Sequence, residues 1–193
     1  MAGPARYTAL LDACVLFPVA VCDSLLTLAA TGLFAAKWTE RIETEWMAAL
    51  ATQTRRSAAD YGPRRDAMRD AVPDWEVPTS AWQTLAGGLF LPDPNDVHVL
   101  AAAIAGHADC IVTANLKDFP SDCLAPWGLT AIHPDDFIVA QIDLAPLLTV
   151  AAFKAQRARL RRPSFTPEDF ASALERNGLV QTAQRLREAA ALI

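Results

Sequence analysis

The sequence predicts a three-layer α/β domain over residues 5–140, followed by an α-helical extension over residues 143–193. Two observations support this fold class. Short apolar or β-branched runs alternate with helical segments up to residue 140, whereas the remainder has a helical pattern throughout. Because strands that alternate with helices form right-handed parallel crossovers, we expect a central parallel sheet flanked by helices. The extension is too short for more than a marginal core, so we expect it to pack on the sheet domain.

The first strand and helix are predicted near the N-terminus. The stretch "RYTALLDA" (residues 6–13) is a short apolar run that ends in an aspartate, as expected for a buried strand with a polar carboxyl end. The stretch "CDSLLTLAATGLF" (22–34) is predicted to be a helix. Asp23 or Ser24 would cap the start of this helix, and Gly32 would mark its end.

A short strand and two helices are predicted next. The stretch "AAKW" (35–38) predicts the strand, and Thr39 stands where it can cap the helix "ERIETEWMAALATQ" (40–53). The arginine-rich segment 55–71 is predicted to be a further helix, which the Gly-Pro pair at positions 62 and 63 interrupts.

The second half of the domain repeats the alternation. The stretch "TSAWQTLAGGL" (79–89) predicts a helix that stops at its paired glycines, and residues 94–106 form an alanine-rich helix. The stretch "ADCIVTAN" (108–115) predicts a β-branched strand, and "LTAIHP" (129–134) predicts the last one. In the extension, helices are expected to break at the prolines at 163 and 167 and to stop at the Asn-Gly pair at 177 and 178.

Composition is typical of a folded globular chain, with 52% hydrophobic and 20% charged residues. The four cysteines include no CxxC pair and there are only three histidines, so no zinc-ligand spacing is present and we expect reduced thiols. The N-terminus lacks the features of a signal peptide, and no apolar stretch is long enough to span a membrane. We therefore expect a cytoplasmic protein without a membrane partner.

The distribution of charge bears on the possible partners. A net charge of −5 argues against a nucleic-acid partner. Of the 17 lysines and arginines, however, five fall within residues 154–162 and five more within residues 55–69. These two basic blocks could contact phosphates, and solvated helix faces are the alternative interpretation.

Aspartates stand at several predicted strand-to-helix junctions. In "LPDPNDVHVLAAA" (91–103), Asp93 takes the N-cap position of a helix and Asp96 its third position, so capping alone explains both. Asp12 ends the first predicted strand, where a carboxylate is costly inside the sheet but suits the edge at which ligands bind. Asp12 and Asp96 are therefore expected near the same edge.

The third junction adds further polar groups. Asp118, together with Asn115 and Thr113, follows the strand predicted at 108–115. Each of these residues also has a structural explanation as a cap or turn residue. Mutually repelling carboxylates gathered at one edge usually need a cation, and hard oxygen ligands select Mg²⁺ or Mn²⁺ over zinc. Such an ion suits phosphoryl chemistry.

The helix predicted at 40–53 is expected to supply another acid. Glu43 and Glu45 lie on opposite flanks of the buried stripe, and periodicity does not choose between them, whereas Glu40 points away. His98 follows Asp96 by two residues, which is about 200° around a helix. We therefore expect His98 to face elsewhere rather than to act as a general base.

Four stretches in this order resemble a known family. "LLDACVLFP", "TERIETEW", "LPDPNDVHVLAAAIAGHADCIVTANLKDFP" and "HPDDF" are similar to the PIN-domain family, in particular to the VapC-like toxins of bacterial toxin–antitoxin pairs. The resemblance covers residues 7 to 140, and its long third stretch is the most specific part. The helical tail resembles the C-terminal extension of one subgroup of these proteins. The resemblance thus implies a PIN-like α/β fold.

The resemblance also implies an activity and a site. It implies a Mg²⁺- or Mn²⁺-dependent endoribonuclease in which Asp12, Glu45 and Asp96 match the family's acids. Many members have an aspartate where this chain has Asn115, with Asp118 three residues further on, so the choice between these two as metal ligand stays open. The metal ligands implied are Asp12, Asp96, Glu45 and Asp118; the catalytic residues implied are these four with Asn115 and Thr113.

The resemblance implies partners as well. These are an RNA substrate, a cognate antitoxin protein that holds the toxin inactive, and a second copy of the chain in a homodimer. Two other interpretations are kept beside it. Asn115 favours a binding module with a vestigial site that acts through partners. A structure-specific DNA nuclease or a small phosphatase on a similar sheet is the other alternative.

Overall fold

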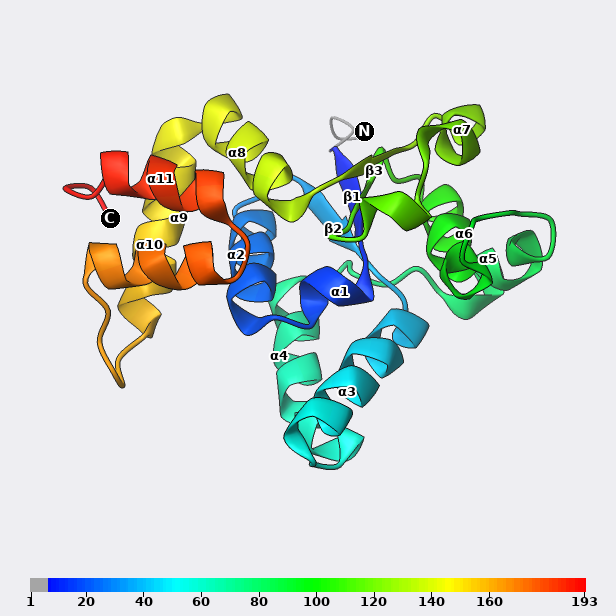
Figure 1. Cartoon of the computed structure of the whole chain (residues 1–193), viewed down its shortest axis with the longest axis horizontal. Helices are drawn as coiled ribbons and strands as arrows, with labels where there is room; N and C mark the ends of the chain where they lie inside the picture. Colours follow the sequence, from blue (N-terminus) through cyan, green and yellow to red (C-terminus); the bar gives the residue numbers. More distant parts are fainter. Residues whose placement is uncertain (1–6) are drawn as a thin grey trace.

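Four short parallel strands form the centre of the molecule. The computed structural model describes residues 7–193, so Arg6, the first residue of the predicted first strand, lies outside the described part. The strands are β1 (Thr8–Leu11), β2 (Ala35–Lys37), β3 (Cys110–Val112) and β4 (Thr130–Ile132). They pair in the order β2-β1-β3-β4, with every pair parallel (Figure 1). The three-layer α/β class predicted from the sequence is therefore confirmed.

Helices cover both faces of the sheet. The first half contributes α1 (Ala13–Leu16), α2 (Val19–Ala30), α3 (Glu40–Thr54) and α4 (Gly62–Ala71), with the 3₁₀ turn η1 (Ala58–Tyr61) between the last two. The second half contributes α5 (Thr79–Ala86), η2 (Pro94–Asp96), α6 (Val97–Ala105), η3 (Leu116–Asp118), α7 (Ser121–Leu124) and η4 (Ala125–Trp127). Figure 1 shows α2 on one side of the sheet and α5 and α6 on the other. Among residues 7–193, no helix is long and apolar enough to cross a membrane.

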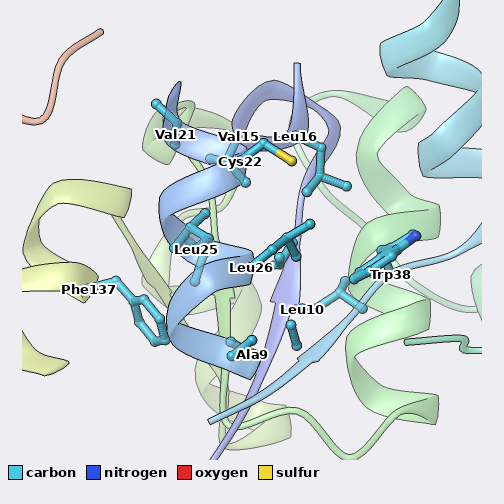
Figure 2. Close-up of a cluster of buried hydrophobic side chains, with 14 of the residues drawn as sticks. Ala9, Leu10, Val15, Leu16, Val21, Cys22, Leu25, Leu26, Trp38 and Phe137 are labelled. Carbon is cyan, nitrogen blue, oxygen red and sulfur yellow. The ribbon is translucent and has the colours of Figure 1, made fainter. Parts of the chain in front are cut away.

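The hydrophobic core between β1 and α2 holds the first layer in place. Leu10 of β1 and Leu25 of α2 are fully buried, and Figure 2 shows α2 presenting its apolar side chains toward β1 and Trp38. Burying one leucine side chain stabilises a fold by about 2 kcal/mol. Phe137 closes the cluster from the opposite side of α2 (Figure 2). Because β1 is buried on both faces, its carboxyl end is the first place where a polar side chain is tolerated.

Proline and glycine set the helix boundaries, and here two predictions are wrong. Helix α2 begins at Val19, directly after Pro18, so Asp23 and Ser24 lie inside the helix instead of capping it. A proline before or at the first turn loses no hydrogen bond and fixes a helix-compatible φ. For the same reason Pro63 stands in the first turn of α4, so the α-helix starts at Gly62 and not at residue 55. The predicted interruption at residues 62 and 63 corresponds to the change from η1 to α4.

Other boundaries agree with the sequence. Thr39 caps α3 by accepting a hydrogen bond from the backbone N–H of Ile42 at 3.1 Å. Helix α5 stops at Gly87, and Gly32, with a φ of 83°, follows the end of α2. These caps satisfy backbone groups that a helix end leaves without intrahelical partners. The predicted strand 108–115 is shorter in the structure at both ends, because β3 begins at Cys110 and the last three predicted residues form the loop after it.

The C-terminal part is entirely helical. Its helices are α8 (Pro134–Leu144), α9 (Pro146–Arg159), α10 (Pro167–Arg176) and α11 (Val180–Glu188). Helix α9 packs on α2, and α11 packs on α8. Pro167 starts α10, and the stop at Gly178, with a φ of 85°, is as predicted. Helix α8 runs across residues 140–143, so the predicted boundary between the two domains stays a prediction.

Candidate metal centre

Three loops at one edge of the sheet bring the predicted polar residues together. Asp12 directly follows β1, whereas Asn115 and Asp118 follow β3, which is the neighbour of β1 in the sheet. In parallel sheets the carboxyl ends of neighbouring strands share an edge, where ligands bind. The turn η2, which leads into α6, brings Asp96 to the same edge.

Three carboxylates form the most compact acidic group in the described residues. Oxygen atoms of Asp93, Asp96 and Asp118 lie within 4.8 Å of one another, and all three residues are half-buried. Asp93 also accepts a hydrogen bond from the backbone N–H of Asn95 at 2.9 Å, so it caps η2 as the sequence suggested. Sequence reasoning gave Asp93 that role alone. Its position three residues before Asp96 was the signal that it belongs to the same acidic group.

The electrostatics of this group are unfavourable without a cation. The pKa of Asp96 is raised to about 6, chiefly by burial and then by the neighbouring carboxylates of Asp12, Asp93 and Asp118, against a lowering effect of His98. Like charges placed close together in a partly desolvated site disfavour the ionised form. None of the four aspartates takes part in an ion pair within residues 7–193. The site is therefore short of positive charge.

Asp12 is the most buried of the four aspartates, with 7% of its surface exposed. Its Oδ1 accepts the backbone N–H of Ala13 at 2.6 Å and so caps α1. Its Oδ2 accepts the Thr113 hydroxyl at 2.8 Å and the Cys14 thiol at 3.1 Å. Asp12 is not one of the three closely grouped acids, and Thr113 connects it to the β3 loop by accepting the backbone N–H of Asn115 at 3.0 Å.

Asn115 and Asp118 have different positions in the loop after β3. The side-chain amide of Asn115 donates a hydrogen bond to Oδ2 of Asp118. The carboxylate of Asp118 lies beside those of Asp93 and Asp96, whereas Asn115 contacts that carboxylate as a hydrogen-bond donor. The sequence left open whether Asn115 or Asp118 would bind a metal, and the geometry favours Asp118. Asp118 lies among the acids, and Asn115 is its hydrogen-bond partner.

The two glutamates of α3 have different environments. Glu43 is only 2% exposed, and it accepts hydrogen bonds from Nε1 of Trp38 at 2.9 Å and from Nε of Arg69 at 3.0 Å. Arg69 in turn lies over the ring of Trp75, 4.4 Å from its centroid. Glu43 is therefore part of a satisfied ion-pair network. Glu45 is half-exposed and free of that network.

Glu45 contacts His98, which corrects a prediction. His98 is buried, with its Nε2 2.8 Å from Oε1 of Glu45, and it lies close enough to Asp96 to lower its pKa. The prediction that His98 faces away from Asp96 assumed that both residues lie on one α-helix. Asp96 instead belongs to the 3₁₀ turn η2, and His98 belongs to α6. Glu45 is not part of the closely grouped acids, and it is linked to that edge through His98 and through Arg41, which donates to the backbone carbonyl of Asn95 at 3.4 Å.

Several arginines of the basic blocks are engaged within the fold. Arg64 donates to the backbone carbonyl of Phe17 at 3.2 Å and lies over the ring of Trp46. In the second block, Arg157 donates to the carbonyl of Phe165 and Arg159 pairs with Asp23. The basic residues of the two blocks whose side chains form neither an ion pair nor a hydrogen bond within the described part of the chain are the following: Arg55, Arg56, Arg161 and Arg162.

The donor atoms fit a hard divalent cation. The acidic group offers carboxylate oxygens only, the ligands that Mg²⁺ and Mn²⁺ prefer. A thiolate is not available nearby, because burial raises the pKa of Cys14 to about 12 and keeps the thiol protonated. A cation would also relieve the repulsion that raises the pKa of Asp96. Asp93, Asp96 and Asp118 are the residues placed to hold it, with Asp12 adjacent.

Comparisons with known proteins agree with the fold. A family model described as "PIN domain" matches residues 8–117, more than half of the chain, and the chain belongs to this family. A second family model, described as "VapC50 C-terminal domain", matches residues 134–188, which span helices α8 to α11. The resemblance noted in the sequence is thereby confirmed.

One curated protein is similar to part of this chain. Over 79 residues the chain is 46% identical to a protein of Mycobacterium tuberculosis (strain ATCC 25618 / H37Rv) named "Putative ribonuclease VapC50". The match covers 41% of this chain and 47% of that protein, so the chain spans about half the length of the curated relative it matches. No solved structure matches the chain.

Proposed function

We propose that this protein is a Mg²⁺- or Mn²⁺-dependent endoribonuclease, the toxin of a toxin–antitoxin pair. The observation that carries the proposal is the carboxylate group of Asp93, Asp96 and Asp118 at the sheet edge of a PIN domain, within 4.8 Å and without an ion-pair partner in the described residues. The ribonuclease name of the mycobacterial relative supports RNA as the substrate class.

The residues have distinct roles in the proposed reaction. Asp93, Asp96 and Asp118 would hold the cation, with Asp12 and Glu45 completing its shell directly or through water. Thr113 and Asn115 would fix the carboxylates of Asp12 and Asp118 through the hydrogen bonds described above. A bound divalent cation activates water and stabilises the charge that develops at phosphorus. Cleavage is expected to leave a 5′-phosphate and a 3′-hydroxyl.

Basic side chains outside the folded network would bind the flanking phosphates. Arg55 and Arg56 follow α3, and Arg161 and Arg162 follow α9, and all four are exposed. Arg64 and Arg69 are engaged with carbonyl oxygens and Glu43, so they are poor candidates. Phosphate contacts release counterions, so RNA binding should weaken steeply as the salt concentration rises.

The partners and the domain division are part of the same proposal. A cognate antitoxin would hold the toxin inactive, and the toxin would form a homodimer. Residues 5–140 would be the nuclease domain, and residues 143–193 would be the helical extension. Support for the extension comes from the match of residues 134–188 to a C-terminal domain named after the same relative.

A cleavage assay with matched substrates tests the activity. Purified protein with Mn²⁺ is incubated with structured RNA, flap DNA and a chromogenic phosphate ester, and Asp96→Asn is the control variant. We expect RNA alone to be cut, with activity lost in EDTA and in the variant. Preferential cutting of flap DNA or of the ester would replace the proposal with one of the alternative hydrolases.

Calorimetry separates an enzyme from a binding module with a vestigial site. The wild-type protein is expected to bind Mn²⁺, and Asp96→Ala is expected to remove that binding. Asn115 was the feature that favoured a vestigial site, but its hydrogen bond to Asp118 supports a role for it in an intact one. A wild-type protein without measurable Mn²⁺ binding would support the binding module instead.

A further inference from the structure

Within residues 7–193, the short polar contact of His98 is with Glu45. The imidazole is 2% exposed and lies at the start of α6, where its Nε2 is 2.8 Å from Oε1 of Glu45 on α3. Its other nitrogen, Nδ1, is buried and has no hydrogen-bond partner among residues 7–193. The orientation of the ring is therefore explained by Glu45 and by no other hydrogen bond in the described structure.

Glu45 is held through one oxygen and left open at the other. Oε1 lies 2.8 Å from Nε2 of His98, within hydrogen-bond distance, and accepts from Nε of Arg41 at 3.2 Å. Arg41 additionally donates to the backbone carbonyl of Asn95, 3.4 Å away in η2. No donor within residues 7–193 contacts Oε2 of Glu45. The two contacts together tie α3 to the segment that carries Asp93 and Asp96.

A packing role alone does not account for a histidine at this position. The ring lies beside Trp82, with ring centroids 6.0 Å apart, in a part of the core that an apolar side chain would also fill. A buried ring nitrogen without a partner costs free energy that leucine or phenylalanine would avoid. Such a replacement would lose the contact with Glu45 and the electrostatic effect of His98 on Asp96.

We infer that His98 is a positioning residue for the cation site: its Nε2–H fixes Oε1 of Glu45 and keeps Oε2 free for the cation's coordination shell. The inference rests on the proposed function, because it assigns Glu45 to that shell. Hydrogen bonds that orient a metal ligand typically change metal affinity or activity 10–100-fold when they are lost. His98 itself touches neither substrate nor cation in this role.

Mn²⁺ affinity, measured by calorimetry, is the primary test because it does not depend on turnover. His98→Leu removes the donor, and we expect the affinity to fall about 10–100-fold. His98→Gln places an amide N–H near the position of Nε2 and should restore most of the affinity. His98→Asn is also polar but too short to reach Glu45, so it should behave like His98→Leu, and it serves if the leucine variant folds poorly.

Two controls separate positioning from general destabilisation. Val99→Ala, at the fully buried neighbouring position, should lower the melting temperature and leave the Mn²⁺ affinity unchanged. In a double-mutant cycle, Glu45→Ala should weaken Mn²⁺ binding by itself, and adding His98→Leu to it should cause no further loss. Independent, additive losses would overturn the inference.

Failure of this inference is distinguishable from failure of the proposed function. If the wild type binds Mn²⁺ and cuts RNA, but His98→Leu binds Mn²⁺ as the wild type does, only the role of His98 is wrong. Equal loss in His98→Gln and His98→Leu would overturn it too, because a retained donor would then not matter. A wild type that neither binds Mn²⁺ nor cuts RNA overturns both.

Discussion

Acidic side chains occupy two contrasting regions on either side of the first turns of α3. On one side, Glu43 is buried against Arg69 and receives a further hydrogen bond from Trp38. On the other side, the group of Asp93, Asp96 and Asp118, with Asp12 adjacent, gathers carboxylates without an ion-pair partner in the described residues. The fold thus places a positively charged side chain, Arg69, against the buried Glu43. Within the described residues it places none against these aspartates.

This difference shows which acids serve the fold and which are available for a ligand. A buried charge is tolerated when a partner of opposite charge and hydrogen bonds compensate for its lost hydration. Glu43 meets that condition inside the chain, whereas the aspartate group requires a partner from outside. Proximity to the strand ends alone does not separate the two kinds of acid, but their partners do.

The largest expected effect is the loss of cleavage in Asp96→Asn. Because a divalent cation stabilises the transition state by several kcal/mol, removing one of its central ligands should slow RNA cleavage by roughly a thousandfold or more. The variant should remain folded, as judged by circular dichroism. A variant that cuts RNA at near the wild-type rate would place the functional site elsewhere.

Two separate substitutions on α3 test the difference between the two kinds of acid directly. Glu43→Gln leaves Arg69 without its charged, buried partner and should lower the free energy of unfolding by about 3 kcal/mol. This is the low end of the range for breaking a buried ion pair, because Arg69 can turn toward solvent. Glu45→Gln, at a half-exposed position, should change stability by less than about 1 kcal/mol and should weaken Mn²⁺ binding instead. Chemical denaturation and calorimetry of both variants check this. Similar stability losses in both would contradict the distinction.

A third acid sharpens the comparison because its partners are backbone groups. Asp135, only 4% exposed, accepts the backbone N–H groups of Gln181 at 2.8 Å and Thr182 at 2.9 Å, and so caps α11 from α8. Asp135→Ala should cost about 2 kcal/mol, because two buried donors lose a charged acceptor. Hydrogen exchange should show the loss first in α11. Unchanged protection of α11 would mean that its packing, not this cap, holds the extension.

The smallest expected effect concerns the pH dependence of the metal-free protein. The pKa of Asp96 is raised to about 6 in the fold, so the folded state binds more protons than the unfolded state between about pH 4 and 6. Stability should therefore fall as the pH rises through this window and then stay level. Since Asp96 is half-exposed, solvent screening reduces the contribution to about 1 kcal/mol.

Denaturation in EDTA at pH 5 and at pH 7.5 measures this contribution. The stability difference between Asp96→Asn and the wild type should grow by about 1 kcal/mol in favour of the variant at the higher pH. Mn²⁺ should abolish that advantage at pH 7.5, because it stabilises the folded wild type by binding. A difference that does not change with pH would mean that burial and the neighbouring carboxylates do not raise the pKa of Asp96.

Much of the fold was predictable because its signals are local. Alternating strand and helix patterns, the cap at Thr39 and the stop at Gly87 depend on residues that are close in sequence. The starts of α2 and α4 were mispredicted because the same residues permit two interpretations. A proline such as Pro63 is compatible either with the end of one segment or with the first turn of a helix, and the structure of the residues on either side decides which of the two occurs.

The candidate site was predictable to a lesser degree. The sequence by itself placed Asp12 and Asp118 after strands, and parallel topology then requires these two residues to share an edge. Asp96 lies between two helices, α5 and α6, so only the tertiary structure brought it to that edge. The sequence did not assign Asp93 to the acidic group, because its role as a cap was sufficient to explain it.

Only the tertiary structure decided the partners of the remaining polar groups. It placed Glu43 against Arg69, Glu45 against His98, and the amide of Asn115 against Asp118. The physical reason is that the period of a helix or strand fixes the direction of a side chain relative to its own element alone. Whether a buried acid finds a cation, an imidazole or other acids depends on which neighbouring element supplies the facing group.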